Sequence, residues 1–220
     1  EVRLGPDRRF GLGLAVVEGA ATVAELRGDE PAGRPLLDGN RMDGWSTENN
    51  YWSSGASPNG WRIENGELAL TPSGECSFLT SEAQFGNFTL SLEYRTPGSG
   101  NSGVGFRTPP GGWPSRDGME IQILEKPVDG PLDGLAQMSI YGGVQALARA
   151  DRPEQWNHLV LKADGWMISA WVNGQLVQQY NTLDHPELKH RHLRGCLGFQ
   201  DHHGEIHLRN LRLLDAPDGP

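Results

Sequence analysis

Short segments in which apolar and polar residues alternate, separated by turn residues, most constrain what this chain can fold into. In residues 87–95 every second residue from Phe88 onward is apolar or aromatic, and the residues between are polar. Residues 119–124 repeat the pattern, with Glu120 and Gln122 on the polar side. Because successive side chains of a strand point to opposite faces, each segment predicts a strand with one face in a core. The alternation is typical of antiparallel sheets that bury one side.

Turn residues divide the chain into about a dozen such strands. Asn65-Gly66 and Asn173-Gly174 are hairpin turns of the kind that favours positive φ, and the 30 Gly and 15 Pro suit many tight connections. No internal repeat indicates a propeller or solenoid. The sequence therefore predicts an all-β fold, a two-sheet antiparallel jelly-roll sandwich rather than a closed barrel. The predicted strands are residues 61–63, 67–71, 77–80, 87–95, 102–108, 119–124, 136–141, 156–163, 167–172, 175–180, 195–201 and 205–214.

Two regions are predicted along the chain. Residues 1–34 form an N-terminal extension, either a β-hairpin or the remnant of a preceding segment, with a Gly- and Pro-containing connector at residues 28–35. Residues 35–216 form the jelly-roll domain. The chain begins at Glu1 with no visible signal peptide, which suggests a processed or trimmed sequence.

Charge and hydropathy exclude several classes of partner. The formal net charge of -9 opposes binding to nucleic acid, because nucleic-acid modules usually carry a basic patch. No apolar run approaches the roughly 18 residues that span a bilayer, so we expect no membrane span. A neutral ligand is the better expectation.

The two cysteines leave two alternatives open. Cys76 and Cys196 either form one disulfide, which would stabilise the fold by about 4 to 5 kcal/mol in the chain-entropy model, or remain a pair of small buried thiols. Each lies in or beside a predicted strand, so a disulfide requires that these strands be neighbours.

Polar residues of several strands are predicted to share one sheet face, directed away from the core. Gly103 and Gly105 beside Arg107 would leave open space on this face. A concave face lined by acids, amides, guanidinium groups and imidazoles suits a ligand rich in hydroxyl groups. The residues assigned to this face are Glu93, Arg95, Arg107, Glu120, Gln122, Gln200 and His202.

Sequence motifs in this order resemble the 3-keto-disaccharide hydrolase family, long catalogued as a domain of unknown function. The resemblance spans residues 35–215, and the ordered series is more specific than any single motif. The motifs are PLLDGN at 35–40, DGW at 43–45, WRIENGEL at 61–68, FTLSLEYR at 88–95, NSGV at 101–104, FR at 106–107, GMEIQIL at 118–124, QWN at 155–157, WVNG at 171–174 and GFQDH at 198–202.

This resemblance implies a concanavalin-like or glucanase-like jelly roll, usually secreted or periplasmic, that acts on glycosides oxidised at the sugar C3. A ketone at C3 acidifies the hydrogen on C2, so a base can remove it, the enolate can expel the C1 oxygen, and water can add. Such a site needs a base, a cation or donor at the enolate oxygen, and an acid for the leaving group. The predicted catalytic residues are Glu120, His202 and Arg107, with Arg95 an alternative cation and Glu93 an alternative acid or base. The predicted substrate-binding residues are Glu93, Arg95, Asn101, Trp113, Gln122, Tyr141 and Gln200.

Structural alternatives stand beside these roles. Glu120 and Arg107 could form an ion pair, His202 could cap a surface turn, and Trp113 could pin its loop rather than stack on a sugar. Two departures from the family pattern are Glu125, where Asp is common, and the additional His203, which leaves open which imidazole points inward.

The sequence indicates no definite cofactor, and a divalent cation such as Ca²⁺ is a candidate because many jelly rolls carry one. His185, His190 and His192 lack the spacing of a zinc motif. The competing function is a non-catalytic carbohydrate-binding module. A conventional two-carboxylate glycosidase is less favoured, because Gln122 stands where a second acid would be expected.

Overall fold

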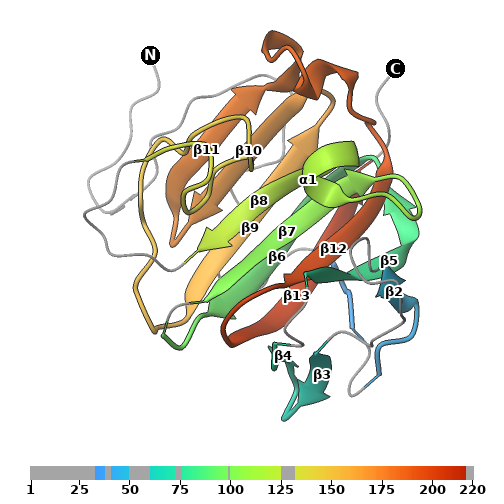
Figure 1. Cartoon of the computed structure of the whole chain (residues 1–220), viewed down its shortest axis with the longest axis vertical. Helices are drawn as coiled ribbons and strands as arrows, with labels where there is room; N and C mark the ends of the chain where they lie inside the picture. The colour runs from blue at the N-terminus through green and yellow to red at the C-terminus, as the bar shows by residue number, and fades with distance from the viewer. Residues whose placement is uncertain are drawn as a thin grey trace, which may run out of the picture.

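Two antiparallel sheets face each other across a shared core in the computed structural model of this chain (Figure 1). The structure describes residues 33–37, 41–49, 60–72, 76–98, 100–124 and 132–216. Apart from three short helical turns, the regular structure in these residues is β. The predicted all-β sandwich is therefore confirmed.

The larger sheet has eight strands in the described part of the chain. Seven follow one another in the order β11, β10, β9, β6, β13, β4 and β3, and β1 also pairs with β13. Their bounds are β1 Arg34–Pro35, β3 Trp61–Glu64, β4 Glu67–Leu70, β6 Asn87–Arg95, β9 Asn157–Asp164, β10 Met167–Val172, β11 Gln175–Asn181 and β13 Ile206–Ala216.

The smaller sheet has five strands in the order β2, β5, β12, β7 and β8. Their bounds are β2 Trp45–Asn49, β5 Ser77–Phe85, β7 Asn101–Thr108, β8 Met119–Leu124 and β12 Gly195–Asp201. The single-turn helix α1 (Pro114–Asp117) connects β7 to β8 and contacts both strands. In Figure 1 this turn lies in front of the smaller sheet, near one end of its strands. Two 3₁₀ turns, η2 (Thr182–Asp184) and η3 (Leu188–His190), precede β12.

The core forms where the apolar sides of the two sheets meet. Leu90 and Leu92 of β6 and Val104 and Phe106 of β7 are fully buried in one cluster. The alternation predicted this inward set correctly for both strands. Asn65-Gly66 and Asn173-Gly174 adopt positive φ at both positions, as their residue types favour.

The prediction of a strand at residues 136–141 is wrong. This segment follows the edge of β8 through backbone hydrogen bonds, for example from the Tyr141 amide to the Glu120 carbonyl at 2.9 Å. Met138 takes a left-handed conformation with φ of 61°, which interrupts a regular ladder, and Ile140 makes only isolated bridges. β1, β2 and α1 were not predicted, because none of them carries a long alternation.

The two cysteines are free thiols, so the disulfide alternative is wrong. Their segments are neighbours, as a disulfide requires, since β5 pairs with β12. The antiparallel register, however, places Cys196 opposite Gln84, eight residues beyond Cys76. At 3.2 to 3.4 Å per residue this separates the two thiols by roughly 25 Å.

The N-terminal hairpin prediction falls on residues 1–32, outside the described residues. No helix in the described part of the chain is both long and apolar enough to cross a bilayer.

Candidate functional site

The outward face of the five-stranded sheet brings together most of the predicted polar residues. Register partners share a face, and Glu120 pairs with Gly105 while Gln122 pairs with Gly103. On the other side of β7, β12 contributes Gln200, whose register partner on β5 is Phe78. The glycines keep the middle strand free of side chains, so the flanking strands set the contour of the face.

One end of this face is covered by the loop before β8. Trp113 is 9% exposed and packs edge-to-face on Phe78, with ring centroids 5.0 Å apart. The Pro114 ring lies over Gly105, where an added Cβ would come within 2.7 Å of it. This packing matches the loop-pinning alternative for Trp113. The Pro114 ring covers the face at Gly105, while the Glu120 carboxyl lies over Gly103, further along β7.

Glu120 is the central ionisable group of this face. Its carboxyl lies over Gly103, where a Cβ would meet Oε1 at 2.0 Å. The side chain is 1% exposed, and neither carboxyl oxygen has a hydrogen-bond partner among the described residues. Burial raises the pKa of Glu120 to about 8, because an ionised carboxylate loses its hydration there. The group can therefore exist in either protonation state near neutral pH.

The side-chain amides of Gln122 and Gln200 share this face with Glu120, and each uses its nitrogen in a contact. The Gln122 nitrogen donates to Asn101 Oδ1 at 3.1 Å, and the Gln200 nitrogen contacts Cys76 Sγ at 3.6 Å. Their Oε1 atoms are buried and have no partner in the described structure. We refer to Glu120, Gln122 and Gln200 as the acceptor cluster. Buried acceptors without partners are costly, so a ligand that supplies donors would be favoured there.

His202 lies at the margin of this cluster. Its Nδ1 is 2.8 Å from the Asn101 amide nitrogen, and its ring stacks on His203 at 3.9 Å between centroids. His202 is half-buried and His203 is exposed, so His202 is the imidazole held against the face. Asn101 is two residues from Gly103 along β7, about 7 Å. Glu120 and the Asn101–His202 pair are thus separated by roughly one sugar ring.

Glu93 and Arg95 do not belong to this site, so their predicted place beside Glu120 is wrong. Both lie on β6 in the eight-stranded sheet. Glu93 accepts hydrogen bonds from Arg209 Nε at 2.6 Å and from the Asn210 amide at 2.8 Å. The Arg95 guanidinium lies 5.2 Å from the centre of the Trp156 ring. Alternation identified their face correctly but could not identify their sheet.

Arg107 does not lie on the predicted face either, so its prediction as a cation beside Glu120 is wrong. Between two register pairs, Phe106 and Arg107 together oppose Leu197 alone, which is a β-bulge. Arg107 has a φ of 53° and is 0% exposed. Its guanidinium donates to the carbonyls of Gly86 and Gly165 at 3.1 and 2.6 Å. The observed contacts are those of a structural anchor between two turns.

The remaining predicted groups have separate environments. Tyr141 is 38% exposed, and its backbone, not its ring, is bonded to the Glu120 strand. His185 Nδ1 accepts from the amides of Glu187 and Leu188, both at 3.2 Å. Within the described ranges, no three His, Cys, Asp or Glu side chains are grouped so as to hold a metal ion. The Ca²⁺ site stays a prediction.

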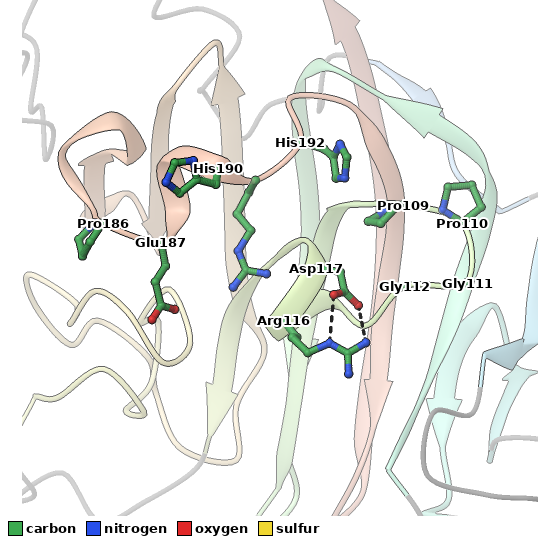
Figure 2. Close-up of a pocket in the computed structure, with 11 residues that line it drawn as sticks. Pro109, Pro110, Gly111, Gly112, Arg116, Asp117, Pro186, Glu187, His190 and His192 are labelled. Atoms are coloured by element: carbon green, nitrogen blue, oxygen red, sulfur yellow. Dashed lines mark hydrogen bonds and ion pairs between the residues drawn. The ribbon is translucent and has the colours of Figure 1, made fainter.

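A groove of about 660 Å³ lies elsewhere on the surface, between the β7–α1 connection and the segment around η3. Figure 2 shows His190 and Glu187 on one side of it and the Arg116–Asp117 ion pair on the other. None of the acceptor cluster is among the described residues that line it. Its mixed charges and open shape distinguish it from the buried acceptors around Glu120.

The sequence analysis did not predict Cys76 as a neighbour of the site. It lies two residues before Phe78, so alternation along the β5 segment would have placed both side chains on the same face. Burial, with the negative charges of Glu120 and Asp201, raises the pKa of its thiol to about 12. We expect a maleimide to label Cys76 about 10³-fold more slowly in the folded protein than in urea, because the thiolate is the reactive form. Labelling followed by peptide mass spectrometry measures this rate. A native rate equal to that in urea would contradict the buried neutral thiol.

Glu120 predicts a specific pH dependence of stability. Its pKa is raised from an ordinary 4.5 to about 8 in the folded protein, so between these values the folded state retains a proton that the unfolded state has lost. Raising the pH through this window therefore destabilises the fold by about 1.4 kcal/mol per unit, with no further loss from this group above about pH 8. Glu120→Gln should remove this loss, so the variant becomes more stable than wild type as the pH rises from 5 to 8. Urea unfolding across this range tests it, and parallel stability curves would contradict it.

Comparisons with solved structures agree with the two-sheet fold. A crystal structure from Parabacteroides distasonis ATCC 8503, provisionally named a glycosyl hydrolase, superposes with a TM-score of 0.66 at 21% identity and covers 83% of this chain and 98% of that one. A second from the same organism and with the same provisional name gives 0.67 at 19% identity, covering 82% and 92%. The carbohydrate-binding module CBM66 of Bacillus subtilis gives 0.55 at 17% identity, covering 80% and 98%. At these identities the likeness shows the fold alone.

The family comparison is more specific than the structural ones. No curated protein matches the sequence. The model of the 3-keto-alpha-glucoside-1,2-lyase-like domain, however, matches residues 33–214, which include every strand of the acceptor cluster. This confirms the resemblance found in the motifs. The chain belongs to the family of 3-keto-alpha-glucoside-1,2-lyase-like domains.

Proposed function

We propose that this protein cleaves glycosides whose sugar carries a ketone at C3, with Glu120 as the group that transfers the proton at C2. The observation that carries the proposal is the buried Glu120 carboxyl. It lies over Gly103, on the same face as the unpartnered amide oxygens of Gln122 and Gln200. Partly desolvated carboxyls with a raised pKa suit proton transfer near neutral pH. Membership of a lyase-like family supports a carbohydrate substrate.

The proposed steps balance without an oxidant or reductant. Ionised Glu120 takes the C2 proton, and the electrons of that C–H bond form an enolate with the C3 oxygen. Re-forming the ketone expels the C1 oxygen, which takes up a proton as it leaves, and a C1=C2 double bond remains. Water then adds at C1 while C2 regains a proton, giving net hydrolysis. Protonated Glu120 is able to give its proton to the leaving oxygen, and the ionised group then takes a proton from the adding water and delivers it to C2.

An ordinary paired-acid mechanism has less support. Such enzymes hold two carboxyl groups about 5 to 10 Å apart across the scissile bond. On β8 the residue two positions from Glu120 is Gln122, whose amide is bonded to Asn101. Asp201 is buried and accepts a hydrogen bond from the Gly60 amide at 2.8 Å. Neither residue offers a second free acid facing Glu120.

A 3-keto-glucoside and its unoxidised parent, incubated in D₂O, test the proposal. We expect release of 3-keto-glucose from the first substrate alone, with deuterium at C2 of the product. Release from both substrates without deuterium would indicate direct displacement and overturn the elimination route.

The competing function is carbohydrate binding without cleavage. It is favoured by one observation: the oxygens of the acceptor cluster would bind sugar hydroxyls even if no proton moved. Binding of both sugars in calorimetry, with no product from either after prolonged incubation, would establish this alternative.

A further inference from the structure

Asn101 connects the acceptor cluster to His202 through a chain of hydrogen bonds whose direction is determined. The Gln122 side-chain atom in contact with Asn101 is its nitrogen, which can only donate. Asn101 therefore presents its oxygen to Gln122 and its nitrogen to His202 Nδ1, at 2.8 Å. Because that amide nitrogen also only donates, Nδ1 must accept.

An accepting Nδ1 determines the state of the whole imidazole ring. A neutral histidine carries one N–H, so the proton of His202 is on Nε2. Burial and the neighbouring His203, opposed by Asp201, lower the pKa of His202, which favours the neutral ring. Backbone hydrogen bonds also hold the turn at residues 202–203 to β7. The backbone N–H of Asn101 donates to the His203 carbonyl at 2.5 Å, and the backbone N–H of His203 donates to the Asn101 carbonyl at 3.3 Å.

The site then has hydrogen-bond acceptors at one end, in the acceptor cluster, and a donor at the other, the Nε2–H of His202. Both oxygens of Glu120 and one oxygen each of Gln122 and Gln200 are buried and unpartnered, and an ionised Glu120 can only accept. Sugar hydroxyls can donate to these atoms. A ketone oxygen cannot, because it is an acceptor only. It needs a donor. The amide nitrogens of Gln122 and Gln200 each donate one of their two N–H groups, to Asn101 and Cys76, and these contacts leave the oxygens rather than the nitrogens of the two amides without partners.

We infer that Asn101 is a positioning residue that holds His202 as the Nε2–H tautomer, and that this N–H binds the C3 carbonyl oxygen of the substrate. The inference rests on the proposed function and extends it, since it names the group that distinguishes an oxidised sugar from its parent. The Glu120 carboxyl lies over Gly103, which is two residues, or roughly 7 Å, along β7 from Asn101. This spacing is about the width of one sugar ring, with C2 toward Glu120 and C3 toward His202. A donor at the C3 oxygen would also stabilise the enolate, the role that Arg107 is too distant to fill.

The tautomer can be observed without any turnover. Long-range ¹H–¹⁵N spectra of uniformly labelled protein, with His202 assigned by comparison with His202→Gln, report which ring nitrogen carries the proton. We expect a protonated Nε2 and an unprotonated Nδ1 in the free protein. A protonated Nδ1 would overturn the inference directly.

Asn101→Asp then tests the link between tautomer and selectivity. One carboxylate oxygen still accepts from Gln122, while the other now accepts from His202 and draws the ring proton to Nδ1. At a pH above the ring's titration in the variant, as read from the same spectra, Nε2 becomes an acceptor. We expect kcat/KM for the 3-keto-glucoside to fall about 10²-fold, whereas the affinity for the unoxidised parent, measured by calorimetry, should change less than about threefold. A transferred proton with unchanged kcat/KM would overturn the inference.

Asn181→Asp is the matched control. Asn181 is at the end of β11 in the other sheet, where its Oδ1 accepts from the Leu183 amide and aspartate can do the same. It should leave both the tautomer and the selectivity unchanged. A wild-type protein that shows no turnover, but has the Nε2–H tautomer and binds the keto sugar more tightly than the parent, would overturn the proposed function while supporting this inference.

Discussion

Replacing Glu120 by glutamine is expected to lower the turnover of a 3-keto-glucoside by about 10²- to 10⁴-fold, the usual worth of a positioned proton-transfer group. The amide has nearly the same shape as the buried acid but can neither take the C2 proton nor return it. In the wild type, kcat/KM should rise with pH and level off above about 8, because the base must be ionised and its pKa is raised to about 8. Initial rates between pH 5 and 9.5 measure both effects.

Glu93→Gln is the matched control for this experiment. Glu93 is the other acid that the sequence assigned to the site, and the structure places it on the eight-stranded sheet in contact with Arg209. Its turnover should be close to that of the wild type. Loss of turnover in Glu93→Gln together with an active Glu120→Gln would contradict the assigned base. Unfolding cannot explain an inactive Glu120→Gln if that variant is more stable than the wild type at pH 8, as expected from the burial of the acid.

The strands and their buried faces could be predicted because alternation is a local property of the sequence. Met119–Leu124 has the bounds expected from its pattern, and its outward pair, Glu120 and Gln122, became two members of the acceptor cluster. The inward residues, such as Ile121, are in the core as expected. A period of two residues is enough to separate the faces of one strand.

Sheet membership could not be predicted in this way. Both sheets turn a polar face outward, so the alternation that placed Glu120 on one outward face placed Glu93 on the other. Only the pairing of β6 with β9 and β13, and of β7 with β8 and β12, separates them. Such pairing depends on contacts between distant segments. A list of polar, outward residues therefore overestimates the number that can meet in one site.

The prediction that Arg107 lies on the face of Glu120 was wrong for a different reason, the β-bulge. One extra residue in β7 inverts the parity from that point onward, and the local sequence gives no turn or proline signal for it. Likewise, Asn101 was predicted as a ligand contact, but its position between Gln122 and His202 requires that β8, β7 and the turn after β12 lie side by side. Whether His202 can serve as the proposed donor therefore depends on the fold as well as on the residue type.

Arg107→Ala is expected to destabilise the protein by about 3 to 5 kcal/mol, a loss typical of substitutions that open a large cavity and leave buried polar groups without their hydrogen bonds. The guanidinium joins Gly86, in the β5–β6 turn, to Gly165, in the β9–β10 turn, and so connects the two sheets at one end. Truncation leaves the buried Gly86 carbonyl and the partly buried Gly165 carbonyl without this donor, and it opens a cavity where the side chain was. Urea unfolding at constant pH measures the change, and Arg107→Lys should retain part of the stability.

Arg209→Ala provides the comparison, because its partly exposed ion pair with Glu93 should contribute about 1 kcal/mol or less. The decisive readout is the pattern of stability and turnover together. If Arg107 is an anchor, Arg107→Ala loses stability, and its folded fraction at low temperature still cleaves the keto sugar. If instead the variant unfolds like the wild type but cannot cleave, Arg107 acts on the substrate, as its place in the sequence motif first suggested. A bulge that buries the guanidinium among backbone carbonyls makes the first result the expected one.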